Sequence, residues 1–248
     1  RQRQMCIRDS LKNIYPLTNQ EKYDNITLLS DNSVILSKNR GEKMRPLNDE
    51  LAAKILEAGK NEFLEKGFRK ASVRSIAAAV NVTTGAVYRY YENKEALFDA
   101  LVSAPAEELY ELYRSYNEDF SKQELSEQIG ELSDGIEDET DGLLGFIYEH
   151  YDAFKLIACC SEGTKYADYV ERLIEIETRS SIKLIRLMQE DGKISENFDE
   201  QLVHIISSMM FNGVFELISH DIPIETAREH IHIIKEFYTA GWYKILGI

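Results

Sequence analysis

From residue 48 onward, apolar positions recur with the period of an α-helix, and the sequence therefore predicts an all-α protein. A first helix is predicted over residues 48–66, where apolar side chains fall on one stripe at spacings of three and four. Gly67 follows, at the point where the end of a helix favours a residue with positive φ. Ser72 and Thr83 are good N-caps that begin two short helices, and Asn93 caps a fourth helix.

The remainder of the chain predicts longer helices. Pro105 is expected to begin a new helix or to kink the fourth one. Residues 118–141 are acidic and interrupted by glycine, so their helices are expected to be short or irregular. A long amphipathic helix is predicted over residues 164–189.

The last two predicted helices are the most apolar ones. Residues 199–219 are apolar around much of the helix circumference, so this helix is expected to be covered on two sides. Pro223 begins the final helix, whose apolar residues alternate at spacings of three and four, as in a heptad seam. The seam residues are Ile224, Ala227, Ile231, Ile234, Tyr238, Gly241 and Ile245.

Residues 1–43 have a different character, because Asn, Ser, Asp and Lys interrupt every apolar cluster. We expect this segment to be disordered or artefactual. Its first ten residues, RQRQMCIRDS, resemble translated sequencing adapter, and residues 40–43 can be encoded by a ribosome-binding site read in frame. Met44 is therefore the expected start of the natural protein.

Charge is distributed unevenly along the chain. The formal net charge is −14, yet residues 44–96 carry +2 and residues 97–248 carry −19. An acidic body repels nucleic acid and acidic membranes, so a contact with nucleic acid has to be confined to the short basic segment. Solubility is the alternative explanation for so many carboxylates. Three cysteines form no disulfide framework and indicate a cytoplasmic location, and no apolar run predicts a membrane span.

Residues 72–91 predict a helix-turn-helix, in which a turn joins two short capped helices. Asn81 is the turn residue, and asparagine tolerates the left-handed conformation that a tight turn needs. The small side chains of Ala77, Ala78 and Gly85 allow the two helices to cross closely. Thr, Tyr and Arg side chains on the second helix suit the major groove of DNA.

The segment VNVTTGAVYRYYENKEALFDAL (residues 80–101) resembles the signature of the TetR/AcrR family of bacterial transcriptional repressors. Residues 52–77 also resemble the first helix of that family and the start of its second helix. The likeness covers about residues 48–100. Asn81 replaces the commoner glycine, and Ser75 replaces the usual acidic residue, so the second helix lacks a full capping box.

The resemblance implies a homodimer that binds a near-palindromic operator in double-stranded DNA. It implies a helix-turn-helix DNA-binding domain over residues 44–96 and a larger helical-bundle domain for ligand binding and dimerisation over residues 97–248. Phosphate contacts are expected from one group of side chains: Ser72, Arg74, Thr83, Tyr88, Tyr90 and Lys94. Base edges are expected to be approached by a second group: Thr84, Gly85, Ala86 and Arg89.

In the C-terminal domain the resemblance implies a pocket for a small molecule and a dimer interface from the last two helices. The heptad seam independently favours that interface, although both helices can instead fill the core of their own subunit. The pocket is expected to be lined by aromatic and Met side chains: Tyr110, Tyr113, Phe146, Tyr151, Phe154, Tyr169, Met188 and Met209. The acidic charge and the many Tyr residues favour a cationic aromatic ligand.

The sequence offers no catalytic motif, so we expect the protein not to be an enzyme. The spacing of the histidines does not suit a metal site, so no metal and no cofactor are expected. The predicted function is a ligand-responsive transcriptional regulator, most simply a repressor, in the cytoplasm. The alternative is an acidic helical module that binds protein and not DNA.

Overall fold

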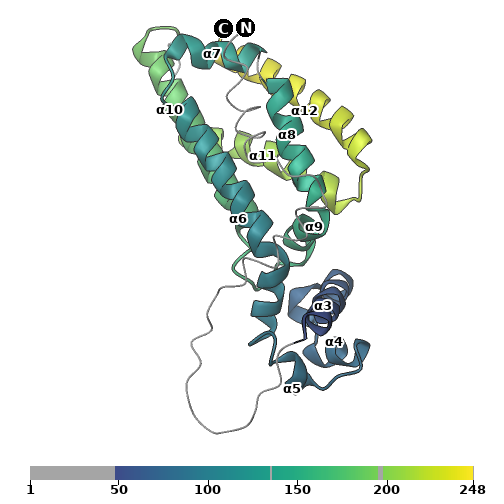
Figure 1. Ribbon diagram of the computed structural model, residues 1–248. Helices are drawn as coiled ribbons and strands as arrows, with labels where there is room; N and C mark the ends of the chain where they lie inside the picture. Colours follow the sequence, from purple (N-terminus) through teal and green to yellow (C-terminus); the bar gives the residue numbers. More distant parts are fainter. Residues whose placement is uncertain (1–47, 135, 195–197, 248) are drawn as a thin grey trace, which may run out of the picture. The chain divides into compact units, whose positions relative to one another are not determined.

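The computed structural model of the chain describes residues 48–134, 136–194 and 198–247 (Figure 1). The predicted extension over residues 1–43 lies outside the described residues. Each element within the described residues is a helix, which confirms the all-α prediction. The helices are α3 (Asp49–Lys70), α4 (Val73–Ala79), α5 (Thr84–Val87), α6 (Lys94–Phe120), α7 (Leu125–Asp134), α8 (Ile136–Glu149), α9 (Tyr151–Cys160), α10 (Tyr169–Glu190), α11 (Glu200–Ser219) and α12 (Ile224–Leu246).

The predicted N-caps of the first helices are confirmed. Oγ of Ser72 accepts a hydrogen bond from a first-turn N–H of α4 at 3.2 Å. Oγ1 of Thr83 does the same in α5 at 3.2 Å, and Oδ1 of Asn93 does so in α6 at 2.7 Å. Asn81 adopts a left-handed φ of 56°, as the turn requires. The start of each of these helices is therefore specified by a side chain next to it in sequence.

The first helix extends past its predicted end. Regular helix geometry stops at Gly67, which has φ 71° and ψ 159°. One further turn follows as far as Lys70, and the N–H of Ala71 donates to the carbonyl of Gly67 at 3.0 Å. The break at Gly67 is the predicted one, and the extra turn carries the chain to the start of α4.

Aromatic side chains join α3 to the helices that follow it. The ring of Phe98 in α6 lies edge-on to Phe63 and to Phe68 of α3, with centroids 5.2 and 5.5 Å apart. Tyr166, which precedes α10, lies 6.1 Å from Phe98 and donates its hydroxyl proton to Asp99. All four rings are buried. The helices α3, α4 and α5, called the head from here on, therefore share one hydrophobic core with the rest of the described chain.

Two helix boundaries differ from the expectation. α6 continues through Pro105 to Phe120, so no new helix begins at the proline. The predicted helix over residues 164–189 starts only at Tyr169. Oγ1 of Thr164 accepts the N–H of Tyr166 at 3.1 Å and donates to the carbonyl of Ser161 at 2.7 Å. These local hydrogen bonds hold the backbone in turns and delay the helix. α6 and α10 then run side by side (Figure 1).

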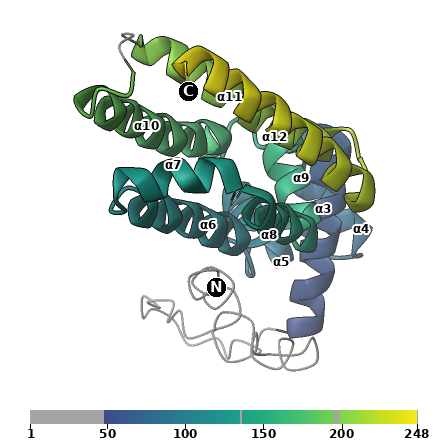
Figure 2. The same cartoon turned by 90° about the horizontal axis from the view of Figure 1, so that it is seen from above.

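The last two helices lie next to each other (Figure 2). The heptad seam of α12 was expected to form an interface between subunits, but part of it packs within one subunit. Ala227 and Ile231 of the seam are buried against Leu144 of α8 and Leu217 of α11, within the same subunit. Ile245, at the other end of the seam, is exposed. The seam therefore packs inside the subunit at its N-terminal half.

α11 is the one helix in the described part of the chain that is long and apolar enough, by length and composition, to cross a membrane. Its most apolar window has a mean hydropathy of 1.4, and 28% of that window is buried. The helix also carries polar residues at mid-length, among them the buried Ser207. One face of the helix packs on the subunit and the other is apolar and exposed, so within one subunit the expected coverage on two sides is not found.

Candidate functional site

The turn between α4 and α5 is closed by backbone hydrogen bonds. The N–H of Asn81 donates to the carbonyl of Ala78 at 3.1 Å, and the N–H of Val82 donates to that of Ala77 at 2.9 Å. These bonds, together with the left-handed Asn81, fix the direction in which α5 leaves the turn. The segment therefore forms the helix-turn-helix that the sequence predicts.

The two sides of this motif differ sharply. The inner side is buried and consists of Val73, Ile76, Ala77 and Val87. The outer side is exposed and consists of Arg74, Thr83, Gly85, Tyr88 and Arg89. Ser72, Thr84 and Ala86 are half-buried at its margin. Tyr88 is a large aromatic side chain that remains 50% exposed although it sits beside the well-packed Val87. The exposed side and its margin together hold eight of the ten predicted DNA-contact residues.

Gly85 lies on this exposed side, and no packing contact requires a glycine there. A Cβ placed on it would approach the hydroxyl of Thr83 at 3.9 Å, which is an ordinary contact. The fold therefore does not need a glycine at this position. A residue without a side chain allows another molecule to approach the backbone closely. In a helix-turn-helix, the second helix lies in the major groove, so DNA approaches its backbone in this way.

Tyr90 and Lys94 lie differently from the expectation that they hold phosphates. The hydroxyl of Tyr90 accepts the N–H of Asn48 at 3.0 Å, which ties the turn after α5 to the start of α3. The ammonium of Lys94 donates to the carbonyls of Phe68 (2.7 Å), Ala71 (3.2 Å) and Arg69 (3.3 Å). It also lies over the Phe68 ring. Three acceptors match the three donors of an ammonium group, so this geometry favours a structural role for Lys94.

Replacing Lys94 by methionine is therefore expected to leave the salt dependence of DNA binding unchanged. Each phosphate contact contributes about −0.9 to the slope of log K against log salt concentration. Arg89→Met, on the exposed side, is expected to lower the magnitude of that slope by about 1. Lys94→Met should instead cost about 1–3 kcal/mol of unfolding free energy, because carbonyl groups lose a charged donor.

Anisotropy titrations of a labelled duplex at several salt concentrations measure the slope, and urea unfolding followed by circular dichroism measures stability. If Lys94→Met lowers the slope by as much as Arg89→Met, Lys94 contacts phosphate and the structural role is wrong.

The predicted ligand residues do not line one site in this structure. Four of them belong to the main hydrophobic core, and two more pack against it. Met188 belongs to a separate cluster with Leu184 and Val203. Met209 is exposed on the outer face of α11. The six residues of the main core and its margin are Tyr110, Tyr113, Phe146, Tyr151, Phe154 and Tyr169.

Several of these tyrosines are anchored to the fold through their hydroxyls. Tyr169 donates to the carbonyl of Ala106 at 2.8 Å, which ties α10 to α6. Tyr151 donates to the carboxylate of Asp221 at 2.7 Å. Burial, and then the hydrogen bond with Asp221, raise the pKa of Tyr151 well above its usual range. The side chains are therefore neutral hydrogen-bond donors at any ordinary pH, and their first role is structural.

Glu177 of α10 is a half-buried polar residue that sequence reasoning missed. Tyr113 of α6 donates its hydroxyl proton to one carboxylate oxygen of Glu177, and Ser181 donates to the other at 3.2 Å. Burial raises the pKa of Glu177 despite these two donors. The sequence does carry a signal, because position 177 continues the buried stripe of Tyr169 and Leu173 at a spacing of four.

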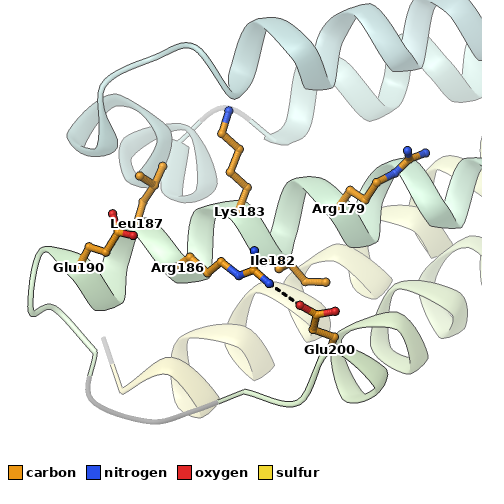
Figure 3. A pocket seen from close by; sticks show the side chains of 7 residues that line it. All are labelled: Arg179, Ile182, Lys183, Arg186, Leu187, Glu190 and Glu200. Carbon is orange, nitrogen blue, oxygen red and sulfur yellow. Dashed lines mark hydrogen bonds and ion pairs between the residues drawn. The ribbon is translucent and has the colours of Figure 1, made fainter.

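A groove of about 380 Å³ runs along the surface of α10 (Figure 3). It is lined by Arg179, Ile182, Lys183, Arg186, Leu187, Glu190 and Glu200. Arg186 pairs with Glu200, and Lys183 donates to the carbonyl of Ser121 at 2.9 Å. None of the eight predicted ligand residues lines this groove.

The two described cysteines are adjacent at the end of α9. Cys159 is exposed and Cys160 is buried, and burial raises the pKa of the Cys160 thiol. A thiol of this kind is a poor nucleophile. Among the described residues, no group of three or more His, Cys, Asp or Glu side chains is placed to hold a metal ion.

Comparison with known proteins points to the same segment. Residues 55–101 match the family model described as "Bacterial regulatory proteins, tetR family". This range begins in α3, includes the whole helix-turn-helix and ends in the first turns of α6.

Two curated relatives are transcriptional regulators by name. An uncharacterized HTH-type transcriptional regulator, YfiR of Bacillus subtilis (strain 168), is 28% identical over 103 residues, which is 41% of this chain and 50% of the relative. The HTH-type transcriptional repressor Rv1474c of Mycobacterium tuberculosis (strain ATCC 25618 / H37Rv) is 36% identical over 64 residues, 25% of this chain and 34% of the relative. The chain thus spans at most half the length of these relatives.

A solved structure agrees in fold over a longer stretch. The TetR-like transcriptional regulator from Rhodococcus sp. RHA1 superposes with a TM-score of 0.51, and the match covers 82% of this chain and all of that one. At 17% identity this similarity concerns the fold alone. Residues 55–101 are therefore similar to the helix-turn-helix of the bacterial regulatory proteins of the tetR family, and the curated relatives that the chain matches are transcriptional regulators by name.

Proposed function

We propose that the protein is a homodimeric repressor that binds a near-palindromic operator in the cytoplasm and releases it when a small molecule binds. The observation that carries this proposal is the exposed side of the helix-turn-helix, where Arg74, Thr83, Tyr88 and Arg89 are exposed together with a glycine that the fold does not require. The motif has a buried inner side and a polar, aromatic outer side. This division suits insertion of α5 into a major groove.

The roles within the site follow from exposure. Thr84, Gly85, Ala86 and Arg89 approach base edges, while Ser72, Arg74, Thr83 and Tyr88 hold phosphates. Tyr90 and Lys94 do not contact DNA in this proposal; their hydrogen bonds tie the motif to the two ends of α3. We propose that both residues position the motif, because their polar atoms already have hydrogen-bond partners inside the head.

An outer apolar face on α11 and α12 supports the homodimer. Its side chains are between 44% and 70% exposed, and they are Leu202, Ile205, Met209, Ile233 and Phe237. A cluster of large exposed apolar side chains of this kind marks a protein interface. A two-fold axis between subunits makes one such patch complementary to itself, and it also matches the symmetry of a palindromic operator.

The link between ligand and DNA runs through α6. This helix begins at Lys94, whose ammonium holds the end of α3, and it carries Phe98, Leu109 and Tyr113 in the shared core. A small molecule that binds among α6, α10 and α11 has to move α6. We propose that this shifts the equilibrium between two arrangements of the heads, with a coupling free energy of about 1–3 kcal/mol.

Fluorescence anisotropy tests the DNA-binding part. The full chain is titrated into a labelled fragment of the DNA upstream of its own gene, with unlabelled random DNA as competitor. Saturable binding that resists the competitor is expected, and Tyr88→Ala and Arg89→Ala should each weaken it at least tenfold, about 1.4 kcal/mol.

The matched control is Arg114→Ala, which removes the same charge from an exposed site on α6. It should leave DNA binding unchanged. Binding that random DNA abolishes, with all variants alike, would instead favour an acidic helical module that binds protein.

A further inference from the structure

Glu62 of α3 is a buried acid inside the head, and it has no part in the DNA contacts proposed above. The residue is only 8% exposed, and each of its carboxylate oxygens has a partner. Oε1 accepts the N–H of Ser72 at 3.0 Å, and Oε2 accepts the ammonium of Lys66 at 2.7 Å. Burial of a carboxylate is unfavourable unless such partners offset the loss of water, so these two bonds account for its place in the head.

The carboxylate of Glu62 is charged at ordinary pH. Burial raises the pKa of Glu62, but the hydrogen bonds from Lys66 and Ser72 outweigh burial and hold the pKa below its usual value. The side chain of Ser75 adds a further hydrogen bond that acts in the same direction. The N–H of Ser72 therefore donates to a full negative charge, which makes a stronger bond than a neutral acceptor does.

The bond to Ser72 is the one that a capping box would supply. Ser72 is the N-cap of α4, and in a capping box an acid three positions later accepts the N–H of the N-cap residue. That position holds Ser75, whose hydrogen bond with Glu62 places it beside the carboxylate. The acid comes instead from α3, ten residues before Ser72. A tertiary contact thus replaces the local acid that the sequence lacks.

Ser72 is consequently held through both its backbone and its side chain. Its N–H donates to Glu62, and its Oγ accepts the N–H of Arg74 at 3.2 Å. Just before it, three backbone carbonyls at the end of α3 accept the ammonium of Lys94. The connection between α3 and α4 is therefore fixed by a cation on its carbonyls and by an anion on the N–H that follows them.

We propose that Glu62 is a positioning residue for DNA binding, which fixes the start of α4 so that the side chains of Ser72 and Arg74 meet operator phosphates. The hydroxyl of Ser72 keeps its proton for a phosphate, because the bond from Arg74 uses only a lone pair of the oxygen. Lys66 balances the charge of Glu62, so the pair presents no net charge to those phosphates. This inference rests on the proposed function, since it names a residue that the same DNA contacts require.

Two variants of similar size distinguish the hydrogen bond from charge and packing. Glu62→Gln keeps an oxygen for the Ser72 N–H, because Lys66, with 37% of its side chain exposed, can turn to water. Glu62→Met fills the same space without an acceptor. Both variants remove a negative charge from the head, and on that ground alone both would bind DNA more tightly than the parent.

We expect the opposite result for Glu62→Met in anisotropy titrations of the full chain with the labelled upstream fragment at several salt concentrations. Its affinity should fall about tenfold, and the magnitude of its salt slope should fall by about 1, because a phosphate contact is lost. Glu62→Gln should stay within about threefold of the parent. Parental or tighter binding by Glu62→Met, or an equal loss in both variants, overturns the proposal.

Ser75→Glu tests the mechanism, because it installs the local capping box. In the Glu62→Met protein the new acid can accept the Ser72 N–H, and affinity should return to within about threefold of the parent. In the parent the same substitution places two carboxylates at one N–H and should bring no gain. Absence of rescue, or an equal gain in both backgrounds, overturns the proposal.

Glu65→Met is the matched control, because it removes the same charge from an exposed site on α3, and it should not weaken DNA binding. Circular dichroism confirms that each variant is folded. If Glu62→Met does not fold, amide hydrogen exchange of the parent protein decides. The Ser72 N–H should be protected, and exchange at the rate of an open chain overturns the proposal.

Failure of this inference is distinguishable from failure of the proposed function. Specific DNA binding by the parent that Glu62→Met retains in full overturns the positioning role of Glu62 and leaves the repressor intact. Absence of specific DNA binding by the parent overturns the proposed function, and the positioning role with it.

Discussion

Replacing Phe98 by alanine is expected to lower the free energy of unfolding by about 3–5 kcal/mol, the usual cost of removing a fully buried aromatic ring. Phe98 has no exposed surface and contacts the rings of Phe63, Phe68 and Tyr166. These residues come from the head, from α6 and from the segment before α10. The cavity therefore opens at the junction of all three and cannot be closed by a local shift.

Urea unfolding followed by circular dichroism measures this loss, at one fixed protein concentration because dimerisation adds to stability. Phe120→Ala, at the half-buried far end of the same helix, is the matched control and should lose less. Since one core joins the head to the rest, a single transition is expected for the parent protein. A loss below about 1 kcal/mol for Phe98→Ala, or an independent transition of the head, would contradict the shared core.

Replacing Phe237 by aspartate is expected to convert the proposed homodimer to a monomer. Phe237 is 70% exposed, next to Ile233 on the same outer face of α12. In a two-fold interface the substitution occurs twice, and each copy loses an aromatic anchor and buries a charge. A loss of about 2–4 kcal/mol for a single central aromatic corresponds to a rise in the dissociation constant of at least 30-fold.

Sedimentation velocity over a range of protein concentrations checks this expectation. Tyr88→Asp is the matched control, because it places the same charge on another exposed aromatic residue, this time in the head. That variant should remain dimeric and lose DNA binding, whereas Phe237→Asp should lose both the dimer and high operator affinity. A dimeric Phe237→Asp protein would show that the outer face of α11 and α12 is not the interface.

The sequence predicted the features that depend on neighbouring residues. Ser72, Thr83 and Asn93 cap their helices because each side chain bonds to an N–H two or three residues away. Asn81 adopts the left-handed turn for a similarly local reason. Caps and turns are decided within a few residues, so the helix-turn-helix was visible before any tertiary contact was known.

Features that depend on distant partners escaped prediction. Tyr90 was expected to hold a phosphate, but its hydroxyl accepts the N–H of Asn48, 42 residues earlier. Lys94 was expected to bind a phosphate, but its ammonium donates to backbone carbonyls that lie 23 to 26 residues earlier, at the end of α3. No pattern in the sequence reveals which backbone group such a side chain reaches.

The pocket residues illustrate a second limit. Aromatic residues at helical spacing fill the core as readily as they line a cavity, and Phe154 and Tyr169 do the former. Glu177, a half-buried acid that continues the stripe of Tyr169 and Leu173, was not found by a search for aromatic residues.

Gly67 has a consequence for the evolution of this chain. Its φ of 71° and ψ of 159° lie in a region open almost solely to glycine, so another residue costs about 1–3 kcal/mol. No heavy atom lies within 4 Å of where its Cβ would be, so the constraint is one of backbone and not of space. Asn81, at φ 56°, can be exchanged for glycine freely. Among descendants of this gene, residue 67 should therefore be invariant, while residue 81 should alternate between asparagine and glycine.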